Sequence, residues 1–153
     1  MRRQSSARST KGFTIIELMT AIVILTVLVM VGVPNFIGRV NKAKEAQLMS
    51  NMRMLVVMLE TYRADWMEFP QNLADLSAAA DAKGYNKEGV NPFNSAKGKL
   101  GSPQVWAIDF VNPGPAGYAG YEYVGPTQYR VYGYDKDGLP LKRDGQIFKL
   151  TNG

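Results

Sequence analysis

Residues 12–34 read GFTIIELMTAIVILTVLVMVGVP, and this stretch decides the fold. The 21 residues from Phe13 to Val33 are mainly large and apolar, and they contain a single charged side chain, Glu17. At a rise of 1.5 Å per residue they make a helix about 30 Å long, which matches the hydrocarbon thickness of a bilayer. The stretch therefore predicts a transmembrane helix.

A secretory signal peptide is the main alternative for this run. Its apolar region is usually about 7 to 15 residues long and ends at a small-residue cleavage site, whereas this run is longer and ends at Val33-Pro34. Four basic residues precede the run, and they favour a cytoplasmic N-terminus with the rest of the chain outside. They are Arg2, Arg3, Arg8 and Lys11.

Composition excludes most catalytic chemistry. The chain has 153 residues, 46% of them hydrophobic, a formal net charge of +5, and neither histidine nor cysteine. It can therefore hold no imidazole base, thiolate nucleophile, disulfide or Cys/His zinc site. The remaining carboxylates, serines, lysines and tyrosines do not cluster in the sequence, so we expect no enzyme.

Glu17 is the unusual residue, because an acid inside an apolar helix is unfavourable and usually has a functional reason. One interpretation is a hydrated side chain at the level of the lipid headgroups. The other depends on the residues that precede it.

Lys11-Gly12-Phe13-Thr14-Ile15-Ile16-Glu17 resembles the processing site of the type IV pilin and type II secretion pseudopilin family. The resemblance implies that a prepilin peptidase cuts between Gly12 and Phe13, removes residues 1–12 as a cytoplasmic leader, and methylates the new amine of Phe13. It also implies that Glu17 is retained for assembly.

The chemistry of the cut supports this role for Glu17. Cleavage creates an α-amino group with a pKa near 7.7 to 8.0, which is a cation beside the apolar run. In a bundle of such helices Glu17 can pair with the amine of a neighbouring subunit. Because desolvation opposes the attraction, the pair would fix the register between helices more than it would add stability.

The helix continues past the apolar run. Residues 13–34 form its transmembrane and assembly half, and residues 35–66 form an amphipathic half whose apolar positions repeat every three or four residues. Its methionines, Met49, Met52, Met54 and Met58, are expected in the core. Pro34 marks either a helix end at the membrane surface or, by the resemblance, a kink or melted stretch within one long helix.

The remainder predicts an α+β fold. Residues 67–104 hold a short helix from Leu73 to Lys83, with Asn72 before it and Gly84 behind it, and a connecting loop. Residues 105–153 read as antiparallel strands at 105–111, 120–125, 128–135 and 146–151. The expected architecture is pilin-like: a long N-terminal helix, its first half protruding, packed on a C-terminal antiparallel sheet.

Two features of the strand region are candidates for binding. Asp135-Lys136-Asp137-Gly138 resembles the opening of a calcium loop, but no bidentate glutamate follows, and the pattern is also an ordinary turn. Asp135 and Asp137 are thus weak metal candidates, and no cofactor is expected. The tyrosines are expected to pack in the sheet, and without a continuous basic patch nucleic acid is not an expected partner. They are Tyr118, Tyr121, Tyr123, Tyr129, Tyr132 and Tyr134.

The resemblance implies a filament subunit. Our main expectation is a type IV pilus protein for adhesion or motility, which moves from the inner membrane as a single-pass precursor to an extracellular pilus. The alternatives are a pseudopilin of a type II secretion system, located in the periplasm, and a minor pilin with a DNA-binding or adhesive role. The implied partners are further copies of the chain, the prepilin peptidase and methyltransferase, the inner-membrane assembly platform, and the bilayer before assembly.

Overall fold

The computed structural model describes residues 12–102 and 106–152, so residues 1–11 of the expected leader lie outside the described part. The chain divides into two compact units, Met1–Val40 and Asn41–Gly153. One helix, α1 (Ile15–Trp66), contributes to both. The prediction of a single long helix is confirmed, and by length and composition α1 is apolar enough to cross a membrane.

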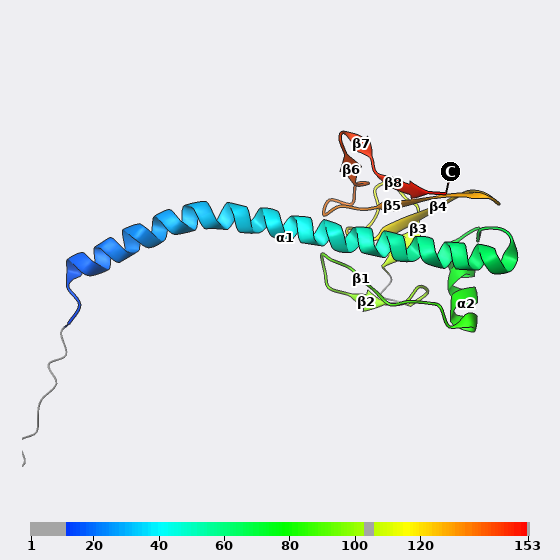
Figure 1. The fold of residues 1–153 in the computed structure, drawn as a ribbon, viewed down its shortest axis with the longest axis horizontal. Coiled ribbons are helices and arrows are strands. Elements are labelled where there is room, and N and C mark those ends of the chain that lie inside the picture. The colour runs from blue at the N-terminus through cyan, green and yellow to red at the C-terminus, as the bar shows by residue number, and fades with distance from the viewer. Residues whose placement is uncertain (1–11, 103–105, 153) are drawn as a thin grey trace, which may run out of the picture. The chain divides into compact units, whose positions relative to one another are not determined.

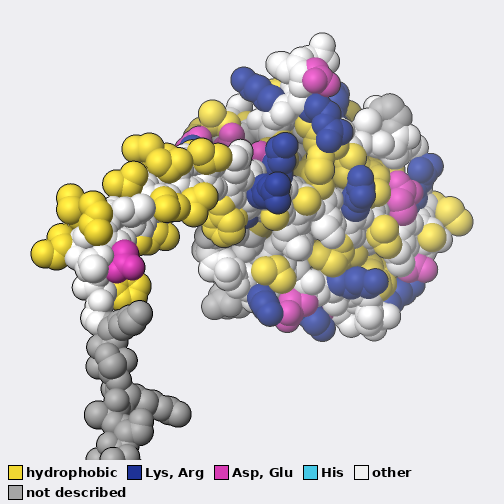
Figure 2. Space-filling model, turned by 60° about the vertical axis from the view of Figure 1, so that its left-hand side comes forward, with side chains coloured by type: hydrophobic (Ala, Val, Ile, Leu, Met, Phe, Trp, Pro, Cys, Tyr) yellow, Lys and Arg dark blue, Asp and Glu magenta, His cyan; other side chains and the backbone are white. Residues whose placement is uncertain are grey.

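In the first unit the large apolar side chains of α1 are exposed, as the yellow helical surface in Figure 2 shows. Its polar side chains bond to carbonyls one turn earlier: Thr20 Oγ1 donates to Ile16 O at 2.8 Å, and Asn35 Nδ2 donates to Val31 O at 3.0 Å. Such bonds satisfy polar groups without water, which a membrane helix requires. Pro34 lies inside α1, so the alternative of a helix end there is wrong.

The second unit holds the sheets and a second helix (Figure 1). Its elements after α1 are α2 (Leu73–Lys83), β1 (Gly89–Val90), β2 (Lys97–Gly98), β3 (Ala107–Asp109), β4 (Ala119–Gly125), β5 (Gln128–Gly133), β6 (Lys142–Arg143), β7 (Gln146–Ile147) and β8 (Lys149–Thr151). Figure 1 shows β4, β5 and β8 along the later turns of α1, with α2 beside its last turns.

The main sheet has the order β3-β4-β5-β8. β4, β5 and β8 are antiparallel, as predicted, but β3 runs parallel to β4, so the purely antiparallel sheet was wrong in this strand. The connection over residues 110–118 carries the chain back to the starting end of β3, and Phe110 N donates to Tyr121 O at 2.7 Å. Two small hairpins, β1-β2 and β6-β7, were not predicted. Residues 146–151, predicted as one strand, form the two strands β7 and β8.

The core lies between α1 and this sheet. The buried side chains of α1 include Leu48, Met52, Leu55, Met58 and Leu59, which confirms the core role of two of the four methionines and the predicted stripe as far as Leu59. At the end of α1 the stripe was wrong, because Trp66 is 53% exposed. Opposite them lie buried aromatic and β-branched residues, Trp106, Tyr121, Tyr129 and Val131. A helix face of this kind drives folding by removing apolar surface from water.

α2 has the predicted bounds and caps. Asn72 Oδ1 accepts a hydrogen bond from Asp75 N at 2.9 Å, and Gly84 ends the helix with φ 75°. The connection that follows was expected to be a loop, but buried asparagines fix it. Asn51 Nδ2 donates to Val90 O at 2.8 Å, and Asn91 Nδ2 donates to Ala116 O at 2.9 Å.

Candidate functional site

The site predicted from the sequence lies at the start of α1. Gly12, Phe13 and Thr14 precede the helix, which begins at Ile15 rather than at Phe13. The Phe13 side chain is 85% exposed, and, apart from the chain neighbours of Gly12, no atom of the described residues lies within 4 Å of a Cβ built on Gly12. The Gly12–Phe13 bond therefore lies in exposed, non-helical backbone, which is the conformation that proteolytic cleavage needs.

Thr14 and Glu17 form a capping box at this helix start. The carboxylate oxygen Oε2 of Glu17 accepts from Thr14 N at 2.9 Å and from Thr14 Oγ1 at 2.7 Å, and Glu17 N donates back to Thr14 Oγ1 at 3.3 Å. This reciprocal bonding satisfies amide groups that the first turn of a helix leaves unpaired. The acid also lies at the positive end of the helix dipole, where a negative charge is favoured.

The sequence analysis missed this arrangement, although the Thr-x-x-Glu spacing that signals it is readable at Thr14 and Glu17. The structure thus gives Glu17 a local role that needs no second subunit. All the hydrogen bonds to its carboxylate in the described part of the chain go to Oε2, so Oε1 can accept from an outside cation.

The acidic turn at Asp135 is the second predicted candidate. Asp135 Oδ1 accepts from Asp137 N and from Leu139 N, both at 2.9 Å, and the Asp137 carboxylate binds Lys136 Nζ at 2.7 Å. Gly138 has φ 76°, as a tight turn requires. Within residues 12–102 and 106–152 no three His, Cys, Asp or Glu side chains come together as a metal site.

The tyrosines of the strands pack in the sheet. Tyr121, Tyr129, Tyr132 and Tyr134 are buried, whereas Tyr118 and Tyr123 are half-buried. Tyr129 Oη donates to Glu60 Oε1 at 3.0 Å, and Tyr132 Oη donates to Glu122 Oε2 at 2.7 Å. The packing role is confirmed for the four buried rings, so they do not offer a stacking surface for nucleic acid.

Comparison with known proteins agrees with the geometry of the N-terminal segment. The profile described as the prokaryotic N-terminal methylation motif matches residues 7–33. The exposed Gly12–Phe13 bond, the capped helix start and the apolar helix all fall within that match. These features define the chain as a pilin-like protein with an N-terminal methylation motif.

Its relatives identify the branch of that class. The chain is 30% identical over 125 residues to type II secretion system core protein G of Escherichia coli K12, which covers 73% of this chain and 86% of the relative. It is 32% identical over 132 residues to the protein of the same name in Aeromonas hydrophila, covering 78% and 88%. The chain belongs to the family of type II secretion system core protein G. No solved structure matches it.

This result changes the order of our expectations. The pilin-like class is confirmed, but the relatives support the type II secretion pseudopilin better than the surface pilus subunit that we placed first. Adhesion and motility find no support among them. None of these relatives is named as an enzyme, which is consistent with the expected structural role.

Proposed function

We propose that the protein is a structural subunit of the pseudopilus of a type II secretion system. It is made as an inner-membrane precursor with its N-terminus inside, cut after Gly12, methylated at Phe13 and assembled by packing of α1 against the same helix of other subunits. In the filament, Glu17 accepts from the α-amine of a neighbouring subunit.

The observation that carries the proposal is the way in which the segment with the Gly12–Phe13 bond leads directly into α1. The Gly12–Phe13 bond is exposed and outside the helix, and α1 begins two residues later with its carboxylate already oriented by Thr14. The large apolar side chains that follow, from Ile15 to Ile37, are exposed in the part of the chain that the structure describes. They require either lipid or other helices, and a filament subunit meets each in turn.

Helix packing would supply the cohesion and Glu17 the register. A charge buried between helices adds little net stability, because its desolvation offsets its attraction to the amine. Helices that slide by one turn would separate the two charges, so the pair selects one alignment. No step of this function needs a catalytic site in the chain, and we assign it no enzymatic activity.

Processing is the first test of this function. In cells that contain the secretion system, intact-mass measurement of the native protein should show the loss of residues 1–12 and the gain of one methyl group. Gly12→Val should block the cut, because a branched side chain crowds the peptidase site. Gly38→Val is the matched control, since this glycine is exposed and lies within α1. A mature chain that keeps its leader would contradict the proposal.

A second test separates the two kinds of filament. Deleting the gene should stop the export of the secreted enzymes of the host and leave surface fibres unchanged. Restoration of export by the full-length gene, and its failure with the Gly12→Val gene, would tie the effect to the processed protein. Loss of surface fibres with normal export would instead support the type IV pilus alternative.

A further inference from the structure

The β6-β7 hairpin is exposed on both of its faces. Lys142 pairs with Ile147 and Arg143 pairs with Gln146, and all six residues from 142 to 147 are exposed. A two-stranded hairpin is only marginally stable in water unless a further strand or a helix covers one of its faces. Here the described part of the chain covers neither face, so both are open to a partner.

The hairpin nevertheless has a fixed shape. Asp144 and Gly145 have φ angles of 53° and 81°, as the two central residues of a type I′ turn do. At the other end of the hairpin Phe148 N donates to Leu141 O at 2.7 Å, and the Arg143 guanidinium lies 5.3 Å from the Phe148 ring centroid. Because its shape is set before a partner arrives, the hairpin loses little conformational entropy on binding.

The base of the hairpin lies beside the first turns of α1 in the second unit. Lys142 and Arg143 line a small cavity together with Glu45 of α1, and Figure 1 shows β6 and β7 at this end of the unit. Ile37 is where the exposed apolar side chains of the first unit end, and Glu45 follows it by eight positions along α1, a rise of about 12 Å. In the membrane-bound precursor the chain itself therefore holds the hairpin near the bilayer surface.

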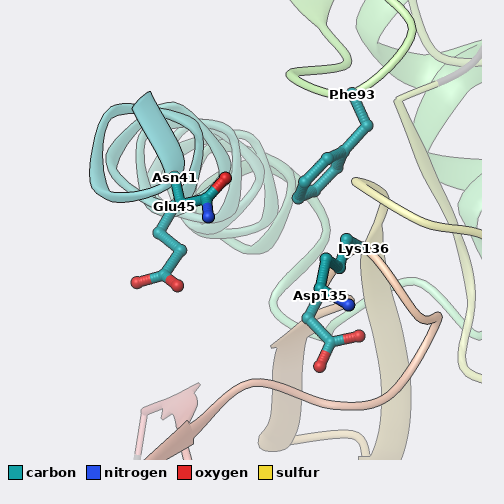
Figure 3. A pocket seen from close by; sticks show the side chains of 5 residues that line it. All are labelled: Asn41, Glu45, Phe93, Asp135 and Lys136. Carbon is teal, nitrogen blue, oxygen red and sulfur yellow. The ribbon is translucent and has the colours of Figure 1, made fainter. Parts of the chain in front are cut away.

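This end of the unit carries more basic than acidic side chains. It comprises residues 41–45 of α1, the turn at 135–137 and the segment 142–149, and Figure 3 shows Glu45 across a cavity from the Asp135–Lys136 turn. The basic residues are Lys42, Lys44, Lys136, Lys142, Arg143 and Lys149, and the acidic ones are Glu45, Asp135, Asp137 and Asp144. The rest of residues 41–153 has seven basic and eight acidic side chains. The net positive charge of the unit is thus concentrated at this end.

Two of the four acids at this end already have partners. Asp137 pairs with Lys136 at 2.7 Å, and Asp135 Oδ1 accepts two backbone amides. In the described part of the chain, by contrast, none of Lys142, Arg143 and Lys149 forms an ion pair. These three cations are therefore free to attract an anionic surface that comes within a Debye length, about 8 Å at physiological salt.

An exposed apolar side chain lies beside these bases. Ile147 exposes 49% of its surface, and because it is the cross-strand partner of Lys142, the two side chains project from the same face of the hairpin. This combination suits a bilayer surface, where cations meet lipid phosphates and apolar groups enter the boundary of the acyl chains. A soluble anion would satisfy the bases but leave Ile147 in water.

We propose that the β6-β7 hairpin binds the phosphate groups of anionic phospholipids at the surface of the membrane that α1 crosses. Lys142, Arg143 and Lys149 supply the charge, and Ile147 enters the interface. The inference goes beyond the proposed function, because it concerns the subunit before assembly and uses only the step in which α1 crosses the membrane. A subunit that leaves the membrane for a filament must break these contacts.

Quenching of a fluorophore on the hairpin tests the contact, because the chain has no cysteine and Gln146→Cys introduces a single one. The full-length variant is labelled there and reconstituted into nanodiscs that contain a lipid with a nitroxide on its headgroup. In equal parts of phosphatidylcholine and phosphatidylglycerol we expect at least twice the quenching seen in phosphatidylcholine alone. Molar salt should remove the difference, because it shortens the Debye length to about 3 Å.

Three double substitutions assign the effect to the hairpin. Lys142→Gln/Arg143→Gln should abolish the rise in quenching, whereas Lys142→Arg/Arg143→Lys keeps both charges and should preserve it. Lys87→Gln/Lys99→Gln is the matched control, since both lysines are exposed and lie outside the three segments of this end. It should leave the rise unchanged. All three variants should keep the melting temperature of the unmodified chain, because the substituted side chains are exposed.

A second label position distinguishes the hairpin from the unit as a whole. Gln71 is exposed and follows the end of α1, so a fluorophore on Gln71→Cys should be quenched weakly and equally in both lipid mixtures. A rise at Gln71 as large as that at Gln146 would overturn the proposal.

Three further results would also overturn it: equal quenching at Gln146 in the two mixtures, a rise that molar salt leaves in place, or an equal loss with the Lys87 control. Unchanged quenching together with a lower filament yield from Lys142→Gln/Arg143→Gln would show that the hairpin binds a protein instead. None of the nanodisc measurements depends on secretion, so the lipid contact and the proposed function are tested separately.

Discussion

At the scale of single residues, Glu17 combines two roles that can be separated by substitution. In the single chain its carboxylate caps α1 through Thr14, and in the filament it is proposed to meet a neighbouring amine. Glu17→Val removes both. We expect the precursor to remain inserted, because valine is more favourable in lipid than a carboxylate. Filament yield should fall at least tenfold, as measured by electron microscopy of filaments isolated from the cell envelope.

Two further variants assign the loss to one role. Glu17→Gln keeps an oxygen that can accept from Thr14 but removes the charge, whereas Thr14→Val removes the hydroxyl bond and keeps the charge. If the charge pair sets the register, Glu17→Gln fails to assemble and Thr14→Val assembles. The opposite pattern would show that Glu17 acts only as a cap.

Some residues of the candidate site could be predicted from the sequence, and others could not. Gly12 and Phe13 were identified through the resemblance of residues 11–17 to a known processing site, and Glu17 also stands out as the single charge in the apolar run. The cap at Thr14 was also readable but was not recognised. The positive φ of Met67, the residue that follows α1, could not have been predicted, because side-chain chemistry alone does not report backbone angles.

At the scale of elements, the later half of α1 is the element on which the second unit depends. Leu55 is fully buried between the helix and the sheet. Leu55→Asp should destabilise the protein by more than about 3 kcal/mol, because it leaves a carboxylate in the core without a partner. Loss of the cooperative thermal transition in circular dichroism is the measurement.

Val57 provides the matched control, since it lies two residues further along α1 and is exposed. Val57→Asp should change the stability by less than about 0.5 kcal/mol, as surface substitutions usually do. Equal effects of the two substitutions would mean that the helix does not present the face described here to the sheet.

The turn between β5 and β6 allows a test of calcium. The Asp135 carboxylate already accepts two backbone amides, and Asp137 is paired with Lys136. We therefore expect millimolar calcium to leave the melting temperature unchanged. A rise that Asp137→Ala abolishes would show that these acids bind the ion, since a ligand specific for the folded state stabilises it.

Elements with strong local signals were predictable, and those set by distant contacts were not. α2 has both caps in its sequence, so its bounds were predicted correctly. The direction of β3 depends on the path of residues 110–118, which local propensity does not encode. β1 and β2 are two residues each, too short for any alternation, and their position depends on Trp106 packed over Gly89, where a Cβ would approach the ring to 2.3 Å.

At the scale of the whole molecule, the second unit holds its own core and should fold without the membrane run. A fragment from Asn35 to the C-terminus keeps the buried stripe from Leu48 to Leu59 and loses most of the exposed apolar helix. We expect it to be soluble and monomeric at micromolar concentration, as checked by sedimentation. Aggregation of this fragment would mean that the first unit contributes to the fold of the second.

The free energy of unfolding of the second unit should fall in alkaline solution. Burial raises the pKa of Tyr121, and burial together with the hydrogen bond to Glu60 raises the pKa of Tyr129. The folded state thus keeps these phenols protonated where the unfolded chain releases its protons, at a pKa near 10. This contribution is complete below pH 10 and is lost as the pH rises above it. Tyr129→Phe should flatten the dependence of the melting temperature on pH between 9.5 and 11.

The hydrogen bonds between Thr14 and Glu17 at the start of α1 also affect how stable the precursor is in the membrane before it assembles. The hydrogen bonds to Thr14 lower the free-energy cost of placing the Glu17 carboxylate in the bilayer. Precursors can therefore accumulate in the membrane before assembly. In the assembly proposed above, Glu17 would exchange or share that bond instead of gaining one where none existed, and the net change in free energy from this residue would be small. We therefore expect growth to be readily undone, with withdrawn subunits returning to the lipid and entering a new filament.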